Sequence, residues 1–206
     1  MRRAHAEVRL RVRAAYGLEE RRPASRTLRL GRGSCSQRLA VLEALARAAG
    51  IASRSRGLLV DGSFWAARFP ALRPVLPELV LLAWPEFRAG PAADPWQDAA
   101  DLFPADGDAE PFGNDGPETL FEAIGRGAAE WRARPGCART GLAGAVRRDL
   151  GLFGSRDELF DRFGGNLPGP VRGLAGPVLT AFARGSSSGS APSSGPARHA
   201  QGGEIG

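Results

Sequence analysis

A cysteine at the start of a predicted helix is the residue of this chain best placed to do chemistry. The segment from Gly31 to Gly57 reads GRGSCSQRLAVLEALARAAGIASRSRG and puts Cys35 directly after Ser34, a good N-cap residue. The positive end of a helix dipole, together with a basic neighbour such as Arg32, favours the thiolate form of a cysteine. A thiolate is a nucleophile for acyl transfer. The segment therefore predicts a nucleophile, with a buried and inert thiol as the alternative.

The residues after Cys35 are expected to form the helix that positions it. Apolar residues recur there at helical spacing, at Leu39, Leu42, Leu45, Ala46 and Ala49. This spacing predicts a helix over residues 35–49 with one buried face, ended by Gly50 in the left-handed conformation. Upstream, residues 4–15 fit either a strand or a helix, and residues 17–33 are expected to be a loop.

Strands are predicted downstream of this helix, at residues 56–60, 63–69 and 79–87. Asp61-Gly62 predicts a tight hairpin between the first two of them. The period then changes from that of strands to that of helices after residue 116. The predicted helices are 117–131 with Pro117 at its first position, 140–150, a short helix after the Ser155–Glu158 capping box, and 170–184.

Composition and pattern divide the chain into three parts. Residues 1–110 contain the cysteine helix and the predicted strands and are expected to form the core domain. Residues 111–184 are predicted to be a helical extension packed on that core. Residues 185–206 are rich in Gly, Ser and Pro and are expected to be a disordered tail.

Two segments within residues 4–103 resemble the transglutaminase-like superfamily. The first is the glycine-flanked Cys35 and its helix, followed by the pattern R-x-x-G-I-x-x-R-x-x-G. The second is LVLLAWPEF at 79–87, which resembles the family's H-A-W-x-E strand except that Leu82 stands at the histidine position. Asp98, two residues after a tryptophan, matches the family's aspartate. The residues of the first pattern are Arg47, Gly50, Ile51, Arg54 and Gly57.

The resemblance implies an α+β fold in which a nucleophile helix packs on an antiparallel sheet, as in a transglutaminase- or papain-like core, with C-terminal helices added. It implies catalytic roles for Cys35 and Asp98, and it favours a helix over residues 4–15. A substrate groove would lie between the cysteine helix and the strand at 79–87. Its lining residues would be Trp65, Trp84, Glu86 and Trp96.

Leu82 leaves the expected catalytic triad incomplete, because acyl transfer by a thiol requires a base and an acid. The chain has two histidines, and His5 or a partner protein is a conceivable source of the missing base. Two functions follow. The first is acyl transfer, or amide or isopeptide hydrolysis, through Cys35 with a compromised triad. The second is a catalytically inactive binding or scaffold domain. In either case the expected substrate or ligand is a peptide, a protein or a small amide.

Composition disfavours several other classes of function. The 206 residues carry a net charge of +6, and all 28 basic residues are arginine. No apolar run is long enough to span a bilayer, so a cytoplasmic protein without membrane contact is expected. No metal or other cofactor is expected, because the histidines and cysteines lie too far apart for a ligand set. Nucleic acid is an unlikely partner, since the arginine-rich first 60 residues contain one aromatic residue, Tyr16.

Overall fold

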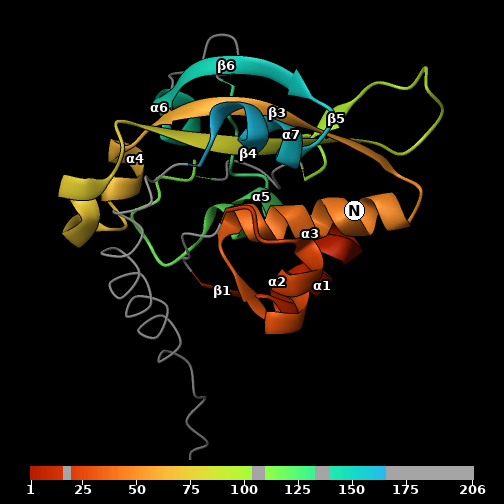
Figure 1. Cartoon of the computed structure of the whole chain (residues 1–206), viewed down its shortest axis with the longest axis horizontal. Helices are drawn as coiled ribbons and strands as arrows, with labels where there is room; N and C mark the ends of the chain where they lie inside the picture. Colours follow the sequence, from red (N-terminus) through yellow and green to blue (C-terminus); the bar gives the residue numbers. More distant parts are fainter. Residues whose placement is uncertain (16–19, 104–109, 133–139, 166–206) are drawn as a thin grey trace, which may run out of the picture.

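A curled antiparallel sheet with helices packed around it forms this α+β protein (Figure 1). The computed structural model describes residues 1–15, 20–103, 110–132 and 140–165. Four strands form the sheet in the order β5-β4-β3-β6, and every neighbouring pair is antiparallel. These strands are β3 (Ala52–Asp61), β4 (Leu79–Arg88), β5 (Gln97–Asp98) and β6 (Val146–Phe153).

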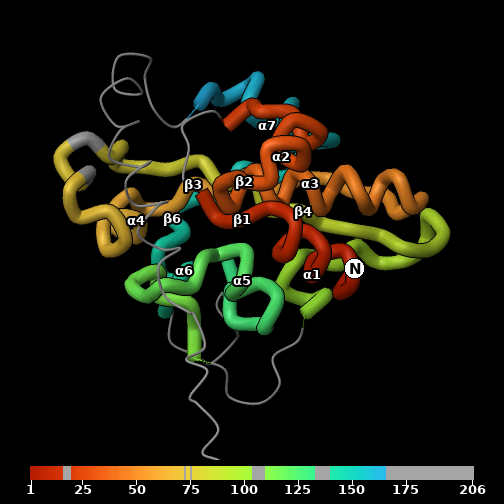
Figure 2. Tube along the Cα trace, turned by 90° about the horizontal axis from the view of Figure 1, so that it is seen from below, coloured from red at the N-terminus to blue at the C-terminus, as the bar shows by residue number. Residues whose placement is uncertain are grey.

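Helix α3 (Cys35–Ala48) packs against β3 and β4, and the other N-terminal helices lie beside it (Figure 2). Ser34 caps it as predicted, accepting a hydrogen bond from the backbone N–H of Gln37, while the Gln37 side chain accepts from the Ser34 N–H. Gly50 follows its end with φ of +76°, a conformation that favours glycine. Helices α1 (Arg2–Arg11), α2 (Ala24–Leu30) and α5 (Leu120–Gly125) pack against α3.

The remaining elements are short. Strand β1 (Arg13–Ala14) pairs in parallel with β2 (Arg32–Gly33), which ties the end of α1 to the residues just before α3. Helix α7 (Arg156–Phe163) packs on β3 and β4, and its Arg156 donates a hydrogen bond to Ser36 Oγ of α3 (3.0 Å). The others are α4 (Ser63–Ala66), the 3₁₀ helix η1 (Pro70–Val75) and α6 (Gly141–Ala145).

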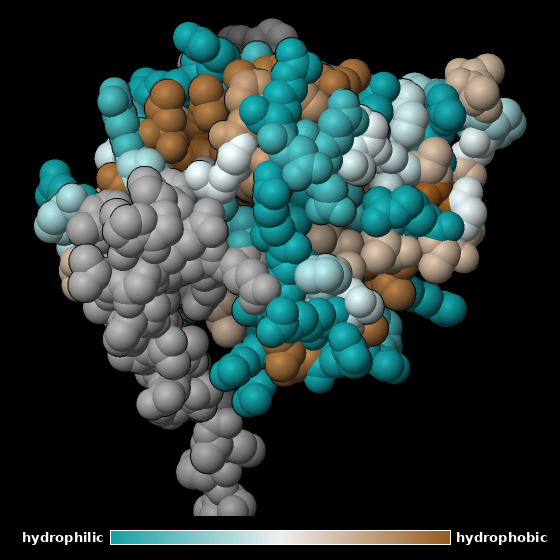
Figure 3. Space-filling model, in the orientation of Figure 1, coloured by the Kyte–Doolittle hydropathy of each residue, from teal (hydrophilic) through white to brown (hydrophobic). Residues whose placement is uncertain are grey.

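Strand β4 divides its side chains between two apolar clusters, because neighbouring residues of a strand point to opposite faces. Leu82 and Trp84 join the larger cluster, which also contains Cys35 and residues of α1, α3, α5 and α6. Leu81 and Ala83 join a smaller cluster with Phe153, Leu159 and Phe160. On the face shown in Figure 3, hydrophilic side chains cover most of the surface.

Several predicted elements are confirmed. The helix at 35–49 and the strand at 79–87 are present within one residue of the predicted bounds. The ambiguous residues 4–15 belong mainly to a helix, α1. The Ser155 hydroxyl accepts a hydrogen bond from the Glu158 N–H (3.1 Å) and begins α7.

The predicted hairpin at Asp61-Gly62 is wrong. The Asp61 carboxylate instead accepts a hydrogen bond from the backbone N–H of Ser63 (2.8 Å), and the chain turns into α4 rather than a strand. The Gly62 N–H donates to the carbonyl of Glu78, which brings the start of β4 back to the end of β3. The two strands are therefore joined by a long connection.

The predicted helix at 140–150 is also wrong, because only residues 141–145 are helical and the rest belong to β6. Leucine and valine at helical spacing suggested a helix, but pairing with the free edge of β3 decides the structure here. Residues 24–30 of the predicted loop form α2, and the helix predicted at 117–131 is only α5. The predicted helix at 170–184 and the predicted tail at 185–206 lie outside the described residues.

Strand β6 and helix α5 lie beyond residue 110 but belong to the same sheet and the same apolar cluster as the residues before it. Within the described part of the chain, no helix is both long and apolar enough to cross a membrane.

Candidate functional site

Cys35 is the first residue of α3 and lies in the core. Its exposed fraction is 8%, and it packs in the larger apolar cluster. No hydrogen bond to its thiol is found among the described residues. The structure therefore places the predicted nucleophile at a helix N-terminus, but under a cover of other side chains.

The strand that should face the cysteine contributes core residues. Leu82, where the sequence resemblance expects a histidine, is 4% exposed, and Trp84 is completely buried. The indole Nε1 of Trp84 has no hydrogen-bond partner within the described residues. Both side chains fill space in the larger cluster, so a substrate does not reach Trp84 in this conformation.

Glu86 is held by two arginines of the neighbouring strand. It is 4% exposed, and it lies opposite Arg54 in the register of β3 and β4. Arg54 Nε donates to its Oε2 (2.7 Å), and Arg56 Nε donates to its Oε1 (2.8 Å). Each carboxylate oxygen thus has a charged donor, which offsets the cost of burying the negative charge.

Asp98 has even more partners than Glu86. Its Oδ2 accepts from Trp131 Nε1 (2.9 Å) and from Arg132 Nη2 (3.0 Å). Its Oδ1 accepts from the backbone N–H groups of Ala100 (2.8 Å) and Asp101 (3.2 Å). The side chain is 4% exposed and anchors the turn after β5. Four donors hold the carboxylate in a structural role.

Arginines stack on two tryptophans around these acids. Trp96 has the Arg54 guanidinium 4.2 Å from its ring centroid and that of Arg88 at 4.6 Å. Trp131 has Arg56 at 5.1 Å and Arg132 at 4.7 Å. Such contacts add about 0.5–2 kcal/mol each. We call this set the arginine–tryptophan network: Arg54, Arg56, Glu86, Arg88, Trp96, Asp98, Trp131 and Arg132.

The structure brings three of the predicted site residues together, namely Glu86, Trp96 and Asp98. Trp65 does not join them, because it belongs to α4 and follows the opposite end of β3. The sequence prediction missed Trp131 and Arg132. Arg54 and Arg56 are two residues apart in a strand, and this spacing indicates that their side chains lie on the same face of the sheet. No feature of the nearby sequence indicates that Trp131 and Arg132 contact Asp98.

His5, the possible substitute base, lies in α1 with 6% exposure. Its Nε2 donates a hydrogen bond to the carbonyl of Phe121 (2.7 Å), and its ring stacks on the Phe121 ring with 4.2 Å between centroids. Burial lowers the pKa of His5. It lines a cleft between α1 and the segment around α5, and neither Cys35 nor Asp98 lines that cleft.

A further buried acid was not predicted. Glu43 of α3 is 2% exposed, and its Oε2 lies 3.5 Å from Arg47 Nη1. Its Oε1 has no hydrogen-bond partner in the described residues. Burial raises the pKa of Glu43 to about 7, and the positive charges of Arg47 and Arg156 oppose this shift.

Comparisons with known proteins transfer no role to these residues. No protein-family model, curated protein or solved structure matches the chain. The roles of the residues must therefore be argued from their contacts.

Proposed function

We propose that this chain is a non-catalytic domain of transglutaminase-like type, which binds its ligand without forming a thioester at Cys35. The observation that carries the proposal is the state of Asp98. Within the described residues, the hydrogen bonds that its carboxylate accepts come from Trp131, Arg132 and the turn that follows it. An aspartate held in this way supports β5 and does not orient a base.

The chemistry of the other positions agrees with this proposal. A thiol acyl transfer requires a group that accepts and returns a proton, and Leu82 can do neither. The absence of a positioned acid–base lowers the rate by about 10²–10⁴-fold. Glu86 is no substitute, since two guanidinium groups stabilise its charged form and occupy both of its oxygens.

The burial of Cys35 supports the same conclusion. A nucleophile must meet its substrate at about 3 Å, and the Cys35 side chain is packed in the core instead. A small apolar side chain at the start of α3 would satisfy the same packing. The expected ligand remains a peptide, a protein or a small amide, which the domain would hold and not transform.

Alkylation of Cys35 by iodoacetamide tests the proposal. The protein should carry Cys137→Ser so that a single thiol is present, and the double variant with Cys35→Ser is the control for background labelling. We expect slow labelling of the folded protein and fast labelling in denaturant, because the folded structure covers the thiol. Fast labelling of the folded protein near neutral pH would instead support acyl transfer through Cys35.

A further inference from the structure

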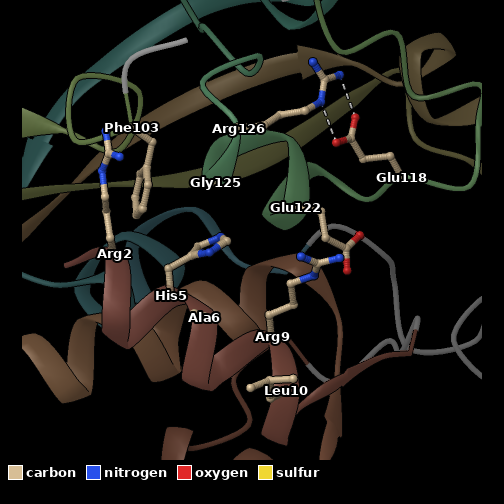
Figure 4. Close-up of a pocket in the computed structure, with 10 residues that line it drawn as sticks. All are labelled: Arg2, His5, Ala6, Arg9, Leu10, Phe103, Glu118, Glu122, Gly125 and Arg126. Carbon is tan, nitrogen blue, oxygen red and sulfur yellow. Dashed lines mark hydrogen bonds and ion pairs between the residues drawn. The ribbon is translucent and has the colours of Figure 1, made fainter. Parts of the chain in front are cut away.

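An open cleft of about 820 Å³ lies between α1 and the segment around α5 (Figure 4). We call it the α1–α5 cleft. Its volume is that of a site for a small organic molecule. One wall is a single face of α1, with residues spaced as a helix face requires. The residues of that wall are Arg2, His5, Ala6, Arg9 and Leu10.

The two acids of the opposite wall are already paired. The Glu118 carboxylate accepts two hydrogen bonds from Arg126, both of 2.7 Å. Glu122 accepts from Arg38 Nη1 (3.0 Å) and from the backbone N–H of Thr119 (2.8 Å). Burial acts to raise the pKa of Glu122, but hydrogen bonds from the hydroxyl and the N–H of Thr119, together with the charge of Arg38, hold it below its usual value. Both acids therefore carry charges that their own partners offset.

The two arginines of the α1 wall are not paired in this way. Within the described part of the chain, Arg2 and Arg9 have neither an ion pair nor a hydrogen bond, and both are exposed. They are seven residues apart on one helix, which is about 10 Å along its axis. A guanidinium group is well suited to bind a carboxylate or a phosphate through two parallel hydrogen bonds. The cleft therefore presents unbalanced positive charge at both ends of its α1 wall.

His5 lies between these arginines and offers an acceptor. The Phe121 carbonyl can only accept, so His5 Nε2 carries the proton and Nδ1 is the acceptor of the neutral ring. No hydrogen bond to Nδ1 is found among the described residues. Burial lowers the pKa of His5 most; the hydrogen bond to the Phe121 carbonyl opposes this, the positive charges of Arg38 and Arg9 lower the pKa further, and Glu122 raises it slightly. Nδ1 of the neutral ring is therefore the acceptor that His5 would offer to a ligand hydroxyl or N–H group, from a side chain that lines the cleft and is 6% exposed.

Gly125 makes room for the His5 ring. A Cβ built at Gly125 would lie 2.3 Å from His5 Cε1 and 2.9 Å from Nδ1. Any larger residue would therefore push the imidazole from its place beside the cleft. The ring is also fixed from its face by Phe121 and lies 5.0 Å from the Phe103 centroid.

We propose that the α1–α5 cleft binds a small organic anion that also carries a hydroxyl group. Arg2 and Arg9 bind its acidic groups, and its hydroxyl donates a hydrogen bond to His5 Nδ1. This inference rests on the proposed function in one respect, which is that the ligand is held and not transformed.

Nuclear magnetic resonance of ¹⁵N-histidine-labelled protein provides the test, since the chain contains only His5 and His199. The probes are citrate, tricarballylate and glycerol 3-phosphate. Tricarballylate has the carboxylates of citrate without its hydroxyl, and glycerol 3-phosphate replaces carboxylates by phosphate. We expect a saturable shift of the His5 Nδ1 signal with citrate or with glycerol 3-phosphate, and no shift of His199. The stronger of the two binders shows whether carboxylate or phosphate is preferred.

Two variants of equal charge separate specific binding from general attraction. Arg2→Gln/Arg9→Gln should weaken binding at least about tenfold, since charge-assisted hydrogen bonds are lost. Arg3→Gln/Arg29→Gln removes two exposed arginines outside the cleft and should leave the affinity within about twofold.

Three results would overturn the inference. The first is no shift of His5 with any probe up to about 10 mM, which excludes useful affinity. The second is equal weakening by the two double variants, and the third is equal binding of citrate and tricarballylate. The Cys35 labelling experiment measures the reactivity of a residue that does not line the cleft. A result that contradicts ligand binding in the cleft can therefore be distinguished from one that contradicts the proposed function.

Discussion

In the arginine–tryptophan network, each oxygen of Glu86 and Asp98 has a donor, whereas in the α1–α5 cleft Arg2 and Arg9 have no partner among the described residues. Both regions are rich in arginine, and sequence composition does not distinguish them. The contacts of their arginine side chains distinguish them. Charges that are buried and fully paired hold a fold together, while exposed charges aimed at a cleft are free to bind a ligand.

The largest expected effect comes from Asp98→Ala in the network. The change leaves Trp131 Nε1 and two backbone N–H groups without their acceptor, and it should lower the free energy of unfolding by about 4 kcal/mol. Urea denaturation measures the loss. Asp115→Ala, at an exposed position, is the control and should cost less than about 0.5 kcal/mol. A loss below about 1 kcal/mol for Asp98→Ala would contradict a structural role for this residue.

Leu82→His introduces the histidine that the proposed transglutaminase-like type would require, and so tests whether the core could be a catalytic site. The position is 4% exposed in an apolar cluster, so a polar ring there should lower stability by about 3 kcal/mol. The variant should also label no faster at Cys35 in its folded state. Leu82→Met, which keeps the volume, is the control and should cost less than about 1.5 kcal/mol. Fast Cys35 labelling in Leu82→His would show that the site can be completed.

Glu43 differs from the acids of the arginine–tryptophan network, because it is buried but one of its carboxylate oxygens has no hydrogen-bond partner in the described residues. Its folded pKa of about 7 lies above the unfolded value, so the native state binds the extra proton. Glu43 therefore contributes stability that is fully present below its unfolded pKa, and this contribution falls by on the order of 2–3 kcal/mol as the pH rises towards 8. Glu43→Gln should flatten this profile and stabilise the protein at pH 8. An unchanged slope between pH 5 and pH 8 would contradict the prediction.

Gly125→Ala tests how firmly the cleft holds His5. The new methyl group overlaps the imidazole, so we expect a loss of about 1–2 kcal/mol and a change in the His5 nuclear magnetic resonance signals. Gly116→Ala is a matched control, because a Cβ at Gly116 has no atom within 4 Å. Unchanged His5 signals in Gly125→Ala would mean that the ring is not fixed there.

The smallest effect on stability is expected for Arg2→Gln/Arg9→Gln. Exposed side chains without described partners contribute little, so the free energy of unfolding should change by less than about 0.5 kcal/mol. Thermal and urea denaturation measure this. A large loss of stability would mean that Arg2 and Arg9 stabilise the fold, as the arginines of the arginine–tryptophan network do.

The parts of the fold that could be predicted from the sequence are those decided by nearby residues. Ser34, Gln37 and Gly50 fix the ends of α3 through contacts within one helical turn, and the apolar run at 79–87 suits a buried strand. Strand β6 could not be predicted, because Val146 and Leu150 also fit a helix. Only the edge of β3, some 90 residues earlier, makes the segment extended.

The candidate site shows the same limit. The spacing of Cys35, Trp84 and Asp98 suggested roles, but burial and partners decide what a side chain can do, and these depend on distant contacts. Trp131 and Arg132 reach Asp98 from more than 30 residues away. The arginine-rich character of the first 60 residues was visible in the sequence, whereas the wall around Gly125 that forms a cleft with α1 was not.

The order of the strands also bears on how the protein is made. Strand β3 lies between β4 and β6; β4 is the next strand of the sheet along the chain and begins at Leu79, while β6 begins only at Val146. During synthesis, one edge of β3 therefore stays open while about 85 further residues are added at about 5–20 residues per second. An open strand edge invites pairing with other chains. The nascent protein thus passes through several seconds in which a chaperone, or a neighbouring nascent chain, can take the place of β6.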